Sequence, residues 1–119
     1  MVKNKKMKIY HNPRCSKSRE TLNLIEQRTK KIEIVEYLKD NLSVIELEEI
    51  IGKLGVNAID LVRKKEDIWI ENYKGKDLTE KEMVEAMVKH PKIMERPIVV
   101  NGENAIIGRP PENVLTILD

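Results

Sequence analysis

The sequence predicts an α/β fold in which a block of helices interrupts a mixed four-stranded sheet. A strand–helix–strand pattern occupies residues 7–37, and a strand hairpin followed by a helix occupies residues 97–118. Helical periodicity dominates between these two patterns. At 119 residues the chain is expected to form a single domain (1–119), with its sheet-forming parts at about 7–40 and 94–119 and the helical insertion at about 41–93.

The N-terminal part has the order of a β-α-β unit. Residues 7–11 are expected to form a short strand, which Asn12-Pro13 ends. A helix is expected from Ser16 to Arg28, followed by a second strand over residues 31–37. A crossover between two parallel strands is almost always right-handed. The residues expected to face the core from the helix are Leu22, Leu24 and Ile25.

The insertion contains two helix-start signals. Ser43 to Glu46 and Thr79 to Glu82 both match a capping box. The first helix is expected to end at Gly55 and the second at Pro91. The apolar residues at helical spacing are Leu47, Ile50, Ile51 and Leu54 in the first helix and Met83, Ala86 and Met87 in the second.

The C-terminal part has the order β-β-α. A strand over residues 97–100, a turn at Asn101-Gly102 and a strand over residues 105–107 predict a hairpin. A cis peptide bond is expected at Arg96-Pro97. The last helix is expected to pack through Val114, Leu115 and Leu118.

The composition excludes several classes of protein. Acidic and basic residues nearly cancel, with a net charge of +2, and one Trp, three Tyr and no Phe are present, so a nucleic-acid surface is not expected. The basic start at Lys3, Lys5, Lys6 and Lys8 lacks the apolar segment of a signal peptide, and no apolar run is long enough to span a membrane. A single cysteine forms no internal disulfide and suits a cytoplasmic location. We expect a monomer.

Cys15 is the leading candidate for a chemical role. It stands where a loop becomes a helix, and unpaired N–H groups at such a position favour thiolate and attract oxyanions. The alternative is a small buried structural cysteine. The Ser18 hydroxyl is placed either to hydrogen-bond the thiolate or to cap the helix, and His11 either to support the thiolate or to satisfy backbone groups. The polar neighbours are Arg14, Ser16, Lys17, Ser18 and Arg19.

Arginines form the second candidate group. Arg96 and Arg109 each precede a proline at the end of a predicted strand, and Arg63 ends a short segment of the insertion. Guanidinium groups suit tetrahedral oxyanions because they donate two parallel N–H bonds. With two distant histidines, one cysteine and no carboxylate cluster, a metal site is not expected.

Four segments together resemble the glutaredoxin-coupled arsenate reductase family, and most closely its short members. Residues 11–22 (HNPRCSKSRETL) resemble the active-site loop, and residues 61–66 (LVRKKE) resemble an arginine motif of the helical region. Residues 96–100 (RPIVV) and 107–112 (IGRPPE) resemble the later motifs. The resemblance covers roughly residues 7–118 and implies a thioredoxin-like fold with a helical insertion.

The resemblance also implies roles for individual residues. Cys15 would be the nucleophile, and three arginines would hold the oxyanion: Arg63, Arg96 and Arg109. The supporting residues would be His11, Ser18, Arg19 and the cis-proline Pro97. No cofactor would be bound; glutathione and glutaredoxin would be external reductants, and arsenic detoxification the role. The alternatives are an Spx-like regulator that binds RNA polymerase and a glutathione-linked thiol oxidoreductase with another substrate.

Overall fold

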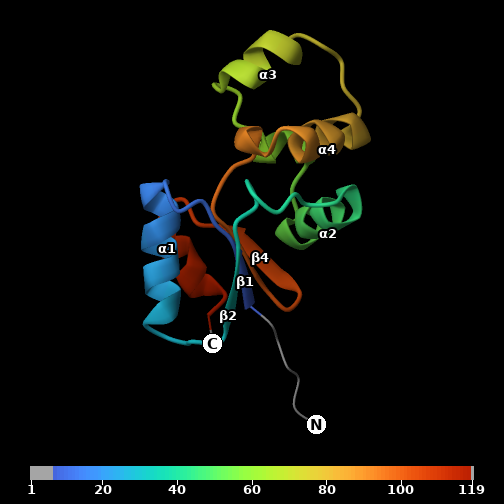
Figure 1. Cartoon of the computed structure of the whole chain (residues 1–119). Coiled ribbons are helices and arrows are strands. Elements are labelled where there is room, and N and C mark those ends of the chain that lie inside the picture. Colours follow the sequence, from blue (N-terminus) through green and yellow to red (C-terminus); the bar gives the residue numbers. More distant parts are fainter. Residues whose placement is uncertain (1–6, 119) are drawn as a thin grey trace. The chain divides into compact units, whose positions relative to one another are not determined.

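The computed structural model describes residues 7–118, and the chain divides into two compact units (Figure 1). The first unit comprises Met1–Asp40 and Arg96–Asp119, and the second comprises Asn41–Glu95. The basic start at Lys3, Lys5 and Lys6 lies outside the described residues. Within the part that is described, no helix is long and apolar enough to cross a membrane.

The first unit is built on a four-stranded mixed sheet in the order β2-β1-β3-β4. The central strand β1 (Met7–Tyr10) runs parallel to β2 (Ile32–Val35) and antiparallel to β3 (Ile98–Asn101). The hairpin is completed by β4 (Asn104–Ile107), antiparallel to β3. The predicted α/β class with a four-stranded mixed sheet is therefore confirmed.

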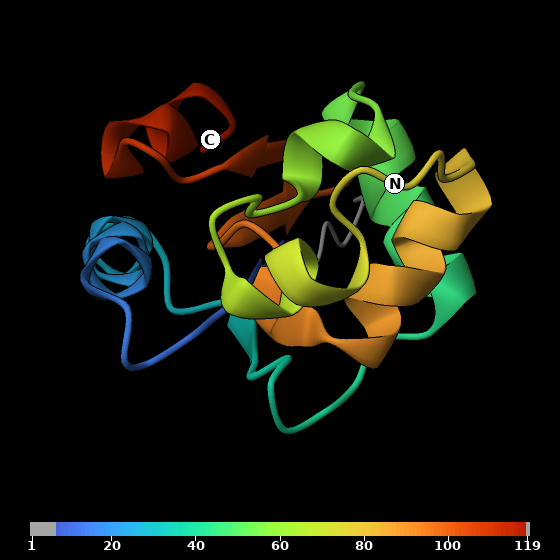
Figure 2. The ribbon, with the colours of Figure 1, turned by 90° about the horizontal axis from the view of Figure 1, so that it is seen from above.

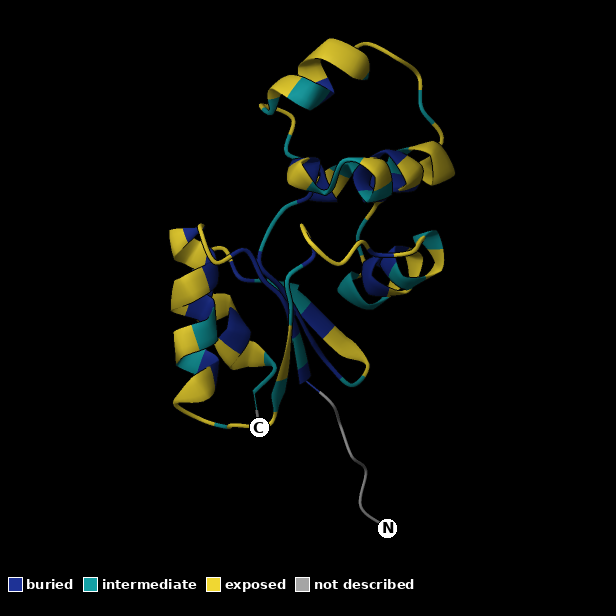
Figure 3. Ribbon diagram, viewed as in Figure 1, coloured by how far each residue is buried: buried dark blue, intermediate teal, exposed yellow. Residues whose placement is uncertain are grey.

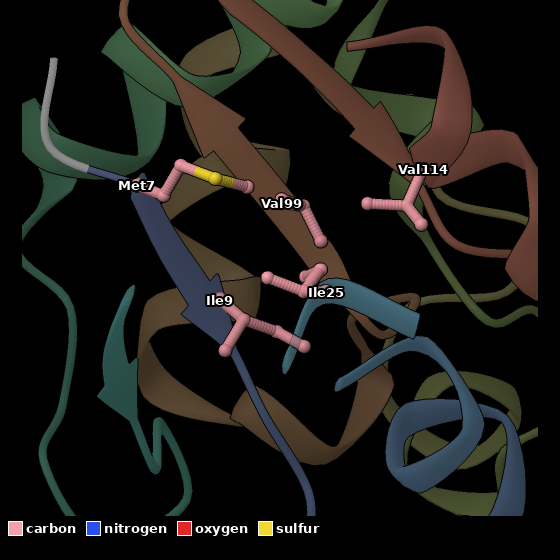
Figure 4. Packing of buried hydrophobic residues seen from close by; sticks show 5 residues of the cluster. All are labelled: Met7, Ile9, Ile25, Val99 and Val114. Carbon is pink, nitrogen blue, oxygen red and sulfur yellow. The ribbon is translucent and has the colours of Figure 1, made fainter. Parts of the chain in front are cut away.

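Two helices pack side by side on this sheet, α1 (Ser16–Glu26) and the 3-10 helix η3 (Pro111–Thr116), as Figure 2 shows. The exposed residues of α1 follow its outer side and the buried ones its inner side (Figure 3). Burying aliphatic side chains is the main source of stability in such a layer. Figure 4 shows the core that results, formed by Met7, Ile9, Ile25, Val99 and Val114.

The C-terminal helix differs from the prediction. It is a 3-10 helix, whose three-residue repeat buries Pro111 and Val114, so Leu115 is 40% exposed rather than packed. The Asn101 side chain is buried and donates from Nδ2 to the Ile117 carbonyl over 2.6 Å. Asn101 also belongs to β3 rather than to the turn, and Gly102 takes the positive φ of 64° that the turn requires.

The second unit is helical. It contains α2 (Val44–Leu54), η1 (Ala58–Leu61), α3 (Asp67–Asn72), α4 (Glu80–Lys89) and η2 (Pro91–Ile93). The N-terminus of α2 is capped by Ser43 Oγ, which accepts from the Glu46 N–H over 3.0 Å, and Gly55 ends the helix at a left-handed φ of 71°. Thr79 and Glu82 form the full capping box of α4.

The apolar faces of these helices follow the predicted spacing with two differences. Leu47, Ile50 and Ile51 are buried on α2, whereas Leu54 is half-buried. On α4 the buried residues include Val84, whereas Met83 is half-buried.

We expect Ile25→Ala to lower the free energy of unfolding by about 2–4 kcal/mol, because it leaves a cavity in the core of the first unit. Ile45 on α2 is the matched control, since it is also a helical isoleucine but is 70% exposed. Urea unfolding monitored by circular dichroism measures both variants. Equal losses for Ile25→Ala and Ile45→Ala would contradict the core assignment.

Candidate active site

The loop between β1 and α1 is shaped by Asn12. The Asn12 carbonyl accepts from the Cys15 N–H over 2.9 Å, and its Oδ1 accepts from the Arg14 N–H over 3.0 Å. These bonds make a tight turn at Pro13 and Arg14, both of which are exposed. Arg19 reaches back from α1 and donates from Nη1 to the Pro13 carbonyl over 2.9 Å. The loop is thus held from the side of β1 and from the side of α1.

Cys15 occupies the N-cap position of α1. Its backbone is extended, with φ −96° and ψ 123°, and its carbonyl accepts the Arg19 N–H over 3.0 Å. Cys15 is buried and directly precedes the first turn of α1. Its sulfur therefore lies near N–H groups that lack carbonyl partners within the helix. An anionic sulfur is favoured there, because these donors and the helix dipole both attract negative charge.

The pKa of the Cys15 thiol lies below its usual value. Burial by itself raises this pKa, but the N–H group of Ser18, the guanidinium of Arg96 and the N–H group of Lys17 together lower it by more. These groups favour the thiolate because hydrogen bonds and opposite charge stabilise the ionised form. A cysteine that is inert and structural does not need such donors, so the environment favours a reactive thiol.

Ser18 contacts the thiol differently from the prediction. The group that stabilises the sulfur is its backbone N–H, whereas its hydroxyl oxygen accepts from the Asn12 N–H over 3.0 Å and lies 2.6 Å from His11 Nδ1. Because that oxygen already accepts one bond, its proton is available to the ring nitrogen of a neutral His11. Both side chains are buried. They therefore tie the loop to the first turn of α1.

Burial lowers the pKa of His11. Arg19 lowers it further, whereas the carboxylates of Glu36 and Glu26 oppose the shift. The imidazole is therefore neutral near pH 7. His11 contributes a hydrogen bond to this site rather than a positive charge.

Two of the predicted arginines lie beside the cysteine. Arg109 donates from Nη2 to Cys15 Sγ over 3.6 Å and from Nε to the Arg96 carbonyl over 2.9 Å. The guanidinium of Arg96 helps to lower the pKa of this thiol, and the Arg96-Pro97 bond is cis as predicted. The Nε of Arg96 is buried and has no hydrogen-bond partner among residues 7–118.

The third predicted arginine, Arg63, belongs to the second unit. A bridge between Val62 and Met94 positions it, together with a bond from its N–H to the Ile93 carbonyl over 2.6 Å. Its Nη2 lies 3.5 Å from the Glu66 carboxylate. Its membership of the anion site stays a prediction.

Sequence reasoning missed the role of Asn12, which it treated as a strand breaker. An asparagine before a proline also predicts a side-chain-to-backbone turn, and that signal was available. Lys17 was expected only as a polar neighbour of the cysteine; it lowers the thiol pKa through its backbone N–H, a group that leaves no mark on residue type. Among residues 7–118, no group of three or more His, Cys, Asp or Glu side chains is placed to hold a metal ion.

Comparison with known proteins identifies the family of this chain. The model of the ArsC family matches residues 10–117. The chain belongs to the ArsC family. An arsenate reductase of Haemophilus influenzae is 46% identical over 112 residues, with 92% of this chain and 97% of that protein covered. The uncharacterized protein YfgD of Escherichia coli is 50% identical over 116 residues, with 96% and 98% covered.

Solved structures agree with this ArsC assignment. The arsenate reductase of Vibrio cholerae superposes with a TM-score of 0.90 at 45% identity, covering 94% of this chain and 97% of that one. The thioredoxin-like fold predicted for the chain is thereby confirmed.

We expect Arg96→Ala to raise the pKa of Cys15, because it removes a guanidinium that stabilises the thiolate. At a pH below that pKa, alkylation by iodoacetamide should slow roughly threefold to tenfold, since the thiolate is the reacting form. The chain has one cysteine, so mass spectrometry reports this site alone. Arg28→Ala, an exposed arginine just after α1, is the control and should alkylate as the parent does.

We expect His11 to make the fold less stable in mild acid. Its pKa is lowered by folding, so the unfolded chain binds the proton more tightly than the folded chain. The stabilisation is present above about pH 6.5 and is lost as the pH falls through the folded-state pKa. Urea unfolding of the parent and of His11→Gln between pH 7.5 and 5.5 measures this. An equal pH dependence in the two proteins would contradict the assignment.

Proposed function

We propose that the protein is an arsenate reductase that uses Cys15 as its nucleophile and an external thiol as its second electron donor. The observation that carries this proposal is the contact between Cys15 Sγ and Arg109 Nη2, 3.6 Å apart at the N-terminus of an 11-residue helix. A nucleophile and an oxyanion ligand are thus adjacent. Membership of the ArsC family supports arsenate as the oxyanion.

In the proposed first step the Cys15 thiolate attacks arsenic, a sulfur–arsenic bond forms, and water or hydroxide leaves. Arg96 and Arg109 stabilise the oxygens of arsenate, because guanidinium groups donate paired hydrogen bonds to oxyanions. By resemblance to the family, Arg63 is the third ligand.

The second step needs a thiol from outside the chain. Reduction of As(V) to As(III) takes two electrons, and two thiols supply them when they join as one disulfide. With one cysteine in the sequence, the second thiol comes from glutathione, whose sulfur bonds to Cys15 as arsenite leaves. Glutaredoxin then reduces this mixed disulfide and returns the Cys15 thiolate. A reducing cytoplasm is the compartment in which this cycle operates.

The decisive experiment is steady-state arsenate reduction with glutathione, glutaredoxin, glutathione reductase and NADPH. We expect Cys15→Ser to lose essentially all turnover, because a hydroxyl neither ionises near pH 7 nor forms a disulfide. The control is Ser16→Ala, an exposed residue beside Cys15 on α1.

Other results would assign another function. Turnover retained in Cys15→Ser would refute the mechanism. Reduction of glutathione-mixed disulfides without arsenate reduction by the parent protein would indicate a thiol oxidoreductase with a different substrate. Binding to RNA polymerase in a pull-down, with no turnover, would indicate an Spx-like regulator.

A further inference from the structure

Thr21 is a fully buried polar residue to which the sequence motifs give no role. It lies on the inner side of α1, six residues after Cys15, and its exposed fraction is 0%. Its Oγ1 donates to the Lys17 carbonyl over 2.8 Å, a bond that many helical threonines make. The same Oγ1 lies 3.4 Å from the carbonyl of Gly108, a residue 87 positions later in the chain. This second contact is not explained by the helix.

Gly108 fits closely against α1 at this point. A Cβ on Gly108 would lie 2.6 Å from Thr21 Oγ1 and 2.9 Å from Pro97 Cγ, closer than side chains approach in folded proteins. Its N–H also donates to the Pro97 carbonyl over 2.9 Å. The backbone at Gly108 is therefore fixed by Thr21 on one side and by Pro97 on the other.

The next residue along the chain is Arg109, and its backbone is restrained as well. The Arg109 N–H donates to the Ile107 carbonyl over 2.9 Å, and its own carbonyl accepts from Asn113 Nδ2 over 3.0 Å. The guanidinium extends from this fixed point to the Arg96 carbonyl and the Cys15 sulfur. Because Arg109 is otherwise exposed, the location of its Cα determines where its guanidinium can reach.

Cys15 and Thr21 lie on one rigid element, since Cys15 caps α1 and Thr21 is part of it. The contact from Thr21 to Gly108 consequently sets the spacing between the helix that carries the sulfur and the loop that carries the guanidinium. We propose that Thr21 is a positioning residue, which sets the distance between the Cys15 sulfur and the Arg109 guanidinium by holding Gly108 against α1. The inference rests on the proposed function, in which both groups act on one anion.

Thr21→Val tests this inference, because valine keeps the shape of threonine but places a methyl group against the Gly108 carbonyl. We expect iodoacetamide alkylation of Cys15 below neutral pH to slow about threefold, since a displaced guanidinium stabilises the thiolate less. Protection of Cys15 from alkylation by arsenate should weaken by a similar factor. Thr21→Ser keeps the hydroxyl and should behave as the parent. Thr116→Val, which removes an exposed hydroxyl bonded to the Asn113 carbonyl, is the matched control.

A double-mutant cycle with Arg109→Ala separates positioning from a general loss of packing. If Thr21 acts through Arg109, Thr21→Val causes no further slowing in the Arg109→Ala protein. The inference is overturned if Thr21→Val alkylates as the parent does, or if it slows alkylation by the same factor with and without Arg109. Urea unfolding identifies a variant that does not fold. If Thr21→Val does not fold, Thr21→Ala replaces it in the same comparison, because alanine removes the two side-chain atoms of Thr21 that lie close to Gly108 and adds none.

The alkylation rates do not require arsenate turnover, so the two proposals fail separately. A slowing that depends on Arg109 in a protein that does not reduce arsenate supports the positioning role and refutes the proposed function. Arsenate reduction by a Thr21→Val protein with parental alkylation rates refutes the positioning role and supports the proposed function. Gly108→Ala provides a second variant, expected to slow alkylation as Thr21→Val does, since its Cβ would force the same separation.

Discussion

The stabilisation of the Cys15 thiolate by the first turn of α1 is the interaction on which the rest of the site depends. The backbone N–H groups of Ser18 and Lys17 contribute to the lowered pKa of this thiol, and they lack carbonyl partners within the helix only while α1 begins at Ser16. The loop fixed by Asn12 determines that starting point. The core formed with β1 and β3 then holds the helix in place. The acidity of the Cys15 thiol thus depends on where α1 starts.

Around this turn, the backbone and the buried side chains have different roles. Backbone N–H groups act on the sulfur, whereas the buried side chains of His11 and Ser18 bond to each other. Two charged side chains, Arg96 and Arg109, then complete the surroundings of the thiol. An anion that enters meets donors that are already oriented, which lowers the reorganisation needed in a transition state.

Much of this arrangement was predictable from the sequence because its signals are local. The strand before Asn12 and the cis bond at Arg96-Pro97 follow from proline and strand patterns. The structure differs from the prediction where the result depends on backbone geometry rather than on residue type. Leu115 is exposed because the last helix has a three-residue repeat, and a helical sequence pattern alone does not distinguish this repeat from that of an α-helix. Ser18 lowers the pKa of the thiol through its backbone N–H, a group that every residue other than proline carries.

The sheet of the first unit is assembled from two ends of the chain, and this has a consequence for synthesis. The strand that precedes Cys15 pairs with β3, and Arg96 and Arg109 flank the β3–β4 hairpin. A ribosome adds these residues about eighty to ninety-five positions after the cysteine and at about 5–20 residues per second. For several seconds the nascent chain therefore carries a thiol without its guanidinium partners. The cysteine acquires its full acidity only when the last part of the chain has joined the first.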